Sequence, residues 1–218
     1  MSIGTPIREV GCLVSSNSEE ESNSSFIETI RENSTDPEVA EMYEKLTEAL
    51  GYLPNYGRQF SHRPAVFNAW VQLNNTIKST MDPRRYELAT VAAAVKRRSS
   101  YCALAHSEKL LELGSTPDEV VALASDPTSA GLSEQEQAIV EYAAIVAGDP
   151  VSVDESDIER LRRVGLSDAE IFDVAAAAAA RCFFASLSDA LGTLPDAGFR
   201  ERMPGLVNTL AVGRSLAE

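Results

Sequence analysis

The sequence predicts an all-α protein, and three observations carry that prediction. Apolar residues recur three or four positions apart along most of the chain, which is the spacing of one helix face. Helix-capping pairs, a Ser or Thr followed three residues later by Glu, precede several of these segments. No alternating apolar and polar run is joined to another by a hairpin turn, so no sheet is expected.

The first helix is expected to begin at Pro37, because Asp36 is a favoured N-cap residue and proline fits the first helical position. Its apolar spacing continues as far as Gly51. Residues 52–62 are predicted to be a loop, since turn-forming residues interrupt them: Pro54, Asn55 and Gly57.

Seven further helices are expected, at about 64–80, 83–98, 101–113, 117–125, 134–147, 155–164 and 168–191. Capping boxes mark three of their starts: Thr116 with Glu119, Ser133 with Glu136, and Ser167 with Glu170. Residues 1–25 end in a polar run without apolar side chains and are predicted to be a mobile tail. Residues 26–218 are then a single all-α domain, long enough to bury a core.

An internal repeat organises these helices. Shifting the chain by 51 residues aligns repeat one, about 82–131, with repeat two, about 133–192, without a gap. Matching positions include Gly114 with Gly165, and Thr116 with Ser167. Two copies of one helical unit explain this pattern most simply.

The two copies differ at three positions that carry reactive groups. Glu87 corresponds to Ala138, Cys102 to Val153, and His106 to Asp157. If both copies share a fold, the fold does not require the reactive residues. They are therefore candidates for function, although a cysteine on a helix is also often a small buried apolar residue.

Cys102 and His106 are four residues apart, so they lie on one face of a helix. A thiol beside an imidazole is the arrangement that produces a thiolate nucleophile near neutral pH. His106 would accept the thiol proton, and Glu87 would hold the imidazole directly or through a water. Tyr101 would donate a hydrogen bond or simply pack in the core.

The same residues carry a family resemblance. Glu87, Ser99, Cys102 and His106 resemble the Glu, Cys, Cys and His of alkylhydroperoxidase D and its relatives in the carboxymuconolactone decarboxylase superfamily, with Ser99 in place of the first Cys. Residues 51–55, 63–64 and 188–192 are similar to the peroxidase-related branch of that family. The likeness covers about residues 36–195 and departs at Ala185-Ser186, where that branch would show Asn-Arg.

The resemblance implies the alkylhydroperoxidase D-like helical fold, a homo-oligomer, and a thiol-dependent peroxidase acting through Cys102 with His106 and Glu87. Because Ser99 cannot form a disulfide, an oxidised Cys102 would be resolved by Cys12, Cys182 or an external thiol. Two alternatives stay open. One is a lyase or isomerase that uses acid-base chemistry on a small organic acid, and the other is a non-catalytic member of the family.

Composition limits the partners. With 33 acidic and 19 basic residues the net charge is -14, which disfavours nucleic acid and anionic membranes. The apolar stretch 174–180 is too short to span a bilayer, and no signal peptide is recognised, so a cytoplasmic protein is expected. The three cysteines are widely spaced and predicted to be reduced. No cofactor is expected, and too few ligands accompany Cys102 for zinc.

Overall fold

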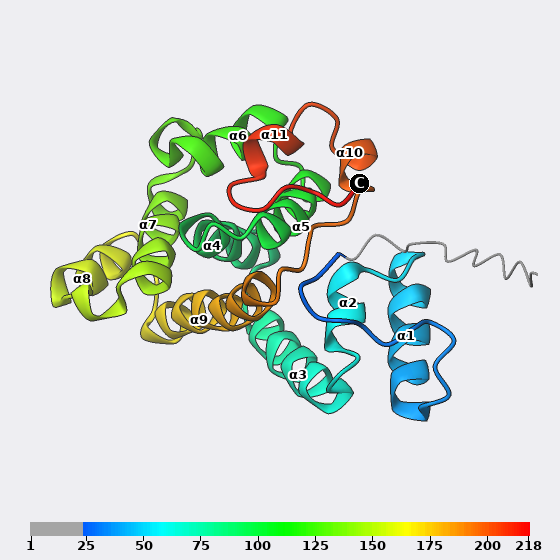
Figure 1. The fold of residues 1–218 in the computed structure, drawn as a ribbon. Helices are drawn as coiled ribbons and strands as arrows, with labels where there is room; N and C mark the ends of the chain where they lie inside the picture. The colour runs from blue at the N-terminus through cyan, green and yellow to red at the C-terminus, as the bar shows by residue number, and fades with distance from the viewer. Residues whose placement is uncertain (1–23) are drawn as a thin grey trace, which may run out of the picture.

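Helices make up all the regular structure of residues 24–218, which the computed structural model describes (Figure 1). The predicted all-α class is confirmed, and the tail prediction for residues 1–23 lies outside the described residues. The helices are α1 Pro37–Leu50, α2 Asn55–Phe60, α3 Pro64–Thr80, α4 Pro83–Lys96, α5 Ser100–Glu112, α6 Pro117–Ser125, α7 Glu134–Gly148, α8 Glu155–Arg163, α9 Asp168–Ala190, α10 Phe199–Arg202 and α11 Val207–Leu210. Short 3-10 turns lie at Pro127–Ser129 and Pro150–Ser152.

Local capping sets most helix ends. The Asp36 carboxylate accepts hydrogen bonds from the first N–H groups of α1, and Gly51 ends that helix with a φ of 80°. All three predicted capping boxes form, at Thr116, Ser133 and Ser167. A fourth, at Asp154, starts α8. The predicted helices are therefore correct to within two residues at their ends.

The predicted loop over residues 52–62 is wrong, because it contains α2. The backbone N–H of Asn55, at the start of this helix, donates to Asp196 Oδ1 at 2.8 Å, so the cap comes from a distant part of the chain. Gly57 lets α2 approach α1 closely, since a Cβ there would lie 2.6 Å from Leu46 Cδ1. Neither contact is visible in the local sequence pattern.

The predicted tail is also too long at its end. Leu194 N–H donates to the carbonyl of Ser24 at 2.8 Å, and Ser25 is buried. Phe26 N–H donates to Leu191 O at 2.8 Å. Residues 24 and 25 therefore belong to the packed structure, because the Ser24 backbone and the Ser25 hydroxyl both bond to the segment around the end of α9.

The two predicted repeats cover α4–α6 and α7–α9. At the offset of 51 residues α7 begins where α4 predicts, whereas α8 begins at Glu155 rather than at 151, the position that the start of α5 predicts. Gly114 and Gly165, which are 51 residues apart, end the second helix of each unit with φ values of 96° and 97°. The central helices α4, α7 and α9 pack against one another (Figure 1). Helix α3 packs against α9 near the C-terminal end of that helix. The last segment of the chain folds back over α4 and α5.

The apolar stretch 174–180 is only the centre of helix α9. The whole helix is long and apolar enough to cross a membrane, judged by length and composition alone. Half of its most apolar window is buried inside the protein. It contacts α3, α4, α7 and α8. These contacts are those of a core helix, and they bring one α9 side chain, Arg181, to the cavity described next.

Candidate active site

A cavity of about 440 Å³ lies where α1 to α5, α9 and the segment after α9 meet. Its floor includes Glu87 from α4, Cys102 and His106 from α5, and Arg181 from α9. Helix α3 closes one side with three polar or aromatic residues: Trp70, Asn74 and Lys78. The predicted residues Glu87, Tyr101, Cys102 and His106 therefore line one cavity.

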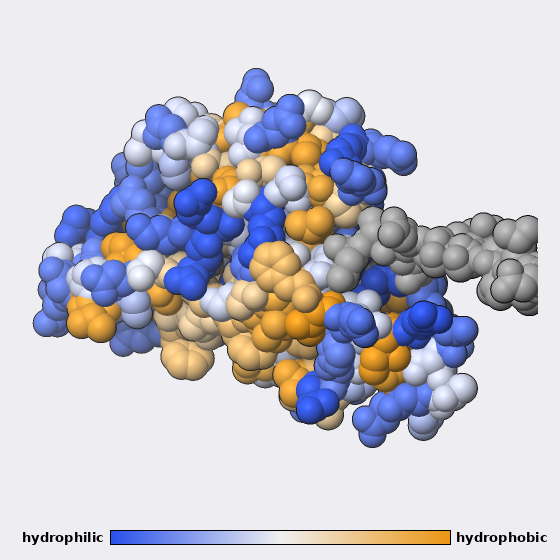
Figure 2. Space-filling view, in the orientation of Figure 1, coloured by the Kyte–Doolittle hydropathy of each residue, from blue (hydrophilic) through white to orange (hydrophobic). Residues whose placement is uncertain are grey.

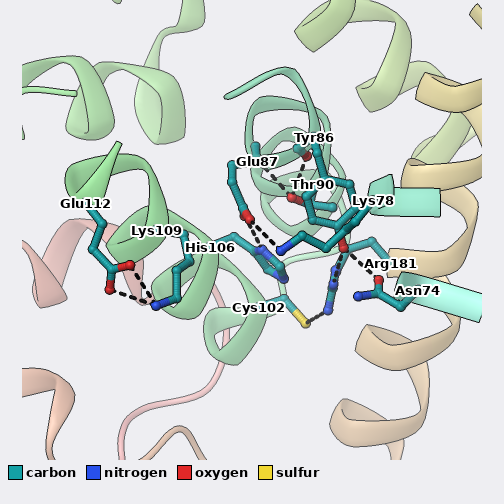
Figure 3. Close-up of polar contacts among 10 residues, drawn as sticks. All are labelled: Asn74, Lys78, Tyr86, Glu87, Thr90, Cys102, His106, Lys109, Glu112 and Arg181. Atoms are coloured by element: carbon teal, nitrogen blue, oxygen red, sulfur yellow. Dashed lines mark hydrogen bonds and ion pairs between the residues drawn. The ribbon is translucent and has the colours of Figure 1, made fainter. Parts of the chain in front are cut away.

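Glu87, which is buried, forms a pair with His106, which is partly buried. His106 Nδ1 lies 2.5 Å from Glu87 Oε2, and Lys78 Nζ lies 3.5 Å from the other carboxylate oxygen (Figure 3). Although burial alone would raise it, the pKa of Glu87 is lowered by the charge and hydrogen bond of His106 and by Lys78. Glu87 is therefore an ionised carboxylate at neutral pH.

The pKa of His106 is lowered from its ordinary value of 6.5, chiefly by burial and then by the charge of Arg181, against the opposing effect of Glu87. A neutral imidazole next to a carboxylate carries its proton on the nitrogen that faces the carboxylate, so Nδ1–H donates to Glu87. The lone pair is then on Nε2. Nε2 makes no hydrogen bond within residues 24–218, which leaves it available as a base.

Cys102 lies one helical turn before His106 and is almost fully buried beside the cavity. Its sulfur lies 3.8 Å from Arg181 Nη1. Among the residues that the structure describes, no hydrogen bond joins this sulfur to His106. The two groups share one cavity, so a proton would pass between them through a bound molecule or after a small movement of either side chain.

Arg181 was not anticipated from the sequence. It is only 3% exposed, donates from Nη2 to Tyr86 OH at 3.3 Å, and lies 5.5 Å from the ring centroid of Trp70. Figure 3 shows its guanidinium directed at both Cys102 and Tyr86. The available signal was that Arg181 is the only charged residue between Val174 and Leu187.

Tyr101 lines the cavity, but its hydroxyl donates to the buried carboxylate of Asp196. Tyr52 OH donates to the same carboxylate at 3.3 Å. Burial raises the pKa of Asp196, and these hydrogen bonds partly offset that effect. Asp196, also missed by sequence reasoning, ties Tyr101 to the α2 cap and fixes this wall of the cavity.

Ser99 is the predicted site residue that does not line the cavity. It is fully buried at the N-cap of α5, and its hydroxyl has no hydrogen-bond partner among residues 24–218. Cys182 is half-buried outside the cavity, with its sulfur 4.0 Å from Ala147 O, and burial raises the pKa of its thiol. Cys12 lies outside the described residues. Residues 24–218 also contain no cluster of three or more potential metal ligands.

The fold and the site together define an all-helical protein whose cavity is built around a thiol and a carboxylate-imidazole pair. Residues 64–144 match the model of the carboxymuconolactone decarboxylase family, so this part of the chain is a domain of that family. The predicted family is thereby confirmed for these residues. No curated protein matches the chain significantly.

Solved structures with the same fold cover most of the chain. A peroxidase-related protein from Ralstonia eutropha JMP134, described as an alkylhydroperoxidase AhpD core, is 21% identical over 80% of this chain and 94% of its own, with a TM-score of 0.73. A peroxidase-related protein from Silicibacter sp. TM1040 is 20% identical over 81% and 94%, also with a TM-score of 0.73. A Cys-to-Ala variant of the debrominase Bmp8, bound to 2,3,4-tribromopyrrole, is 18% identical over 83% and 97%, with a TM-score of 0.68. At these identities the likeness establishes the fold.

Proposed function

We propose that this protein is a thiol-dependent oxidoreductase of the peroxidase type, which reduces organic hydroperoxides through Cys102. One observation carries the proposal: the sulfur of Cys102 lies beside a buried guanidinium and shares a cavity with a neutral, carboxylate-anchored imidazole. A nearby positive charge favours a thiolate over a thiol. The likeness to peroxidase-related structures supports the same chemistry.

In the first step His106 Nε2 takes the thiol proton, and the Cys102 thiolate attacks the terminal peroxide oxygen. An S–O bond forms, the O–O bond breaks, and the leaving alkoxide takes the proton back from His106. The products are a sulfenic acid on Cys102 and an alcohol. The thiol has been oxidised by two electrons, and the hydroperoxide has been reduced by two.

The second step uses an external thiol. Ser99 cannot form a disulfide, and Cys182 lies outside the cavity. A small thiol would therefore condense with the sulfenic acid to a mixed disulfide, releasing water. A second thiol molecule would then attack that disulfide, restore Cys102 and leave as the oxidised dimer.

The proposal is tested by hydroperoxide consumption with small thiol reductants, in wild type, Cys102→Ser and Cys182→Ser. Cys182→Ser is the matched control, because it removes the other thiol within residues 24–218. We expect consumption to be lost in Cys102→Ser and retained in Cys182→Ser. Wild-type rates in Cys102→Ser would rule the proposal out, and so would a wild type that is inactive with every thiol.

A lyase or isomerase is the second candidate, favoured by the lack of a hydrogen bond between Cys102 and His106 within the described structure. Glu87 and His106 would then transfer protons on a small organic acid, while Cys102 only shapes the cavity. In that case turnover would survive in Cys102→Ser and be lost in His106→Ala. Comparing Cys102→Ser with His106→Ala therefore separates the two candidates.

We also propose that the protein is cytoplasmic and that its copies associate through the outer face of α9. The residues of that face are spaced four and three apart, as in helices that pack side by side: Phe172, Ala176, Ala179, Phe183 and Ser186, all exposed except the half-buried Ala176. Figure 2 shows apolar surface in the region where α9 and α3 lie in Figure 1. Leu73 of α3 adds a half-exposed apolar side chain.

A further inference from the structure

Arg181 is a buried cation without a matching carboxylate. The carboxylates that line the cavity are already engaged, and within residues 24–218 none lies within ion-pair distance of Arg181. Their partners are Lys78 and His106 for Glu87, Arg202 for Glu108, Lys109 for Glu112, and Tyr52 and Tyr101 for Asp196. Charged side chains are almost never fully buried unless they are paired.

The hydrogen-bonding capacity of Arg181 is also largely unused. A guanidinium has five N–H donors, and here the acceptors are Tyr86 OH at 3.3 Å and the Cys102 sulfur at 3.8 Å. Nε is buried with no acceptor among the described residues, and the same is true of Trp70 Nε1. Arg181 and both of its acceptors line the cavity, so the guanidinium lies in the wall of the space that a ligand would fill.

The walls beside this cation are flat and apolar. Trp70 and Phe184 lie with ring centroids 4.5 Å apart, and the guanidinium carbon of Arg181 lies 5.5 Å from each ring. Tyr56 packs edge-on against Phe184 at 5.3 Å. A cavity of about 440 Å³ is within the usual range for small organic ligands and much larger than hydrogen peroxide needs.

We propose that the cavity binds a small organic carboxylate, with its carboxylate group on Arg181 beside Cys102 and its flat apolar body against Trp70 and Phe184. Arg181 is then a specificity-determining residue that selects anionic over neutral molecules. The identity of the substrate rests on the proposed function: for a peroxidase, the preferred substrate is an organic hydroperoxide that carries a carboxylate. Binding itself needs no thiol, so it is tested independently of the reaction.

The test compares benzoate with benzamide, which has nearly the same shape but no charge. Trp70 is the only tryptophan, so its fluorescence reports binding in the cavity, and titration calorimetry provides a second readout. We expect benzoate to bind wild type roughly 10- to 100-fold more tightly than benzamide, the usual gain from a charged hydrogen-bonded pair. Cys102→Ser, which cannot act as a thiol peroxidase, should keep that preference.

Arg181→Gln should bind both probes about equally, and Arg181→Lys should keep part of the preference for benzoate. Retained benzamide binding shows that the cavity of Arg181→Gln is intact. If that variant does not fold, the test is the ratio of benzoate to benzamide affinity in wild type, which should decrease as the salt concentration rises. Equal binding of benzoate and benzamide by both wild type and Cys102→Ser would overturn the inference. An undiminished preference in Arg181→Gln would overturn it as well. Loss of peroxidase activity in Cys102→Ser with benzoate binding unchanged would support both proposals separately.

Discussion

Glu87 Oε2 and His106 Nδ1 lie 2.5 Å apart, in a pair that joins α4 to α5; Glu87 is buried and His106 is partly buried. The corresponding positions of the second repeat, Ala138 and Asp157, cannot form such a pair. If the two copies share a fold, as their alignment in the sequence predicts, this helical unit does not require the pair. The pair fixes which imidazole nitrogen is protonated, and this is the property that a general base requires.

His106→Ala should lower hydroperoxide turnover by roughly 10²-fold or more, the usual contribution of a positioned base. Glu87→Gln should lower it less, because the amide still accepts a hydrogen bond from Nδ1. Single-turnover kinetics would measure both effects. The double variant should be no worse than His106→Ala, because the two residues act as one unit. Unchanged turnover in both single variants would show that Glu87 and His106 do not take part in proton transfer.

The pH profile should report the direction of the His106 pKa. The base must be unprotonated, and its pKa is lowered from 6.5, so the decline of turnover with falling pH should be centred below 6.5. The Glu87 charge raises the pKa of His106, so Glu87→Gln should move that decline to still lower pH. Rates measured from pH 4.5 to 8 with both proteins would test this. A decline centred above 6.5 in wild type would contradict it.

Restoring the missing cysteine should create a disulfide. Ser99 is the N-cap of α5 and Cys102 lies three positions further, so both belong to one helical turn. After hydroperoxide treatment, Ser99→Cys should form a bond between positions 99 and 102 and show higher turnover with a dithiol reductant. Peptide mass spectrometry checks the bond. If Cys102 oxidises and no disulfide to position 99 appears, the geometric part of the family analogy is wrong.

Association through α9 should depend on Phe183, whose side chain is 46% exposed. Phe183→Glu would bury a charge in the proposed contact and should shift the protein to a smaller species in light scattering coupled to size exclusion. Leu113→Glu, at a 45% exposed position at the end of α5, is the matched control and should leave the mass unchanged. A wild-type monomer, or an unchanged mass in Phe183→Glu, would contradict the proposed contact.

Features that depend on residues close in sequence were predicted, and features that depend on distant residues were missed. The starts of α1, α6, α7 and α9 depend on caps within three residues, and all were predicted. Helix α2 was missed because Asp196, 141 positions away, caps it. Likewise Cys102 and His106 are helical neighbours, so their common face was predictable, whereas Arg181 reaches Cys102 from 79 positions away. No local pattern contains that contact.

The central claim is that Cys102 is the nucleophile that takes the peroxide oxygen in this cavity. The most direct measurement treats the protein with one equivalent of organic hydroperoxide and a carbon-acid reagent that traps sulfenic acids, then locates the adduct by peptide mass spectrometry. The account predicts an adduct on Cys102, strongly reduced in His106→Ala, and little on Cys182, whose thiol has a raised pKa outside the cavity. Hydroperoxide consumed without modification of Cys102, or equal modification of Cys102 and Cys182, would contradict it.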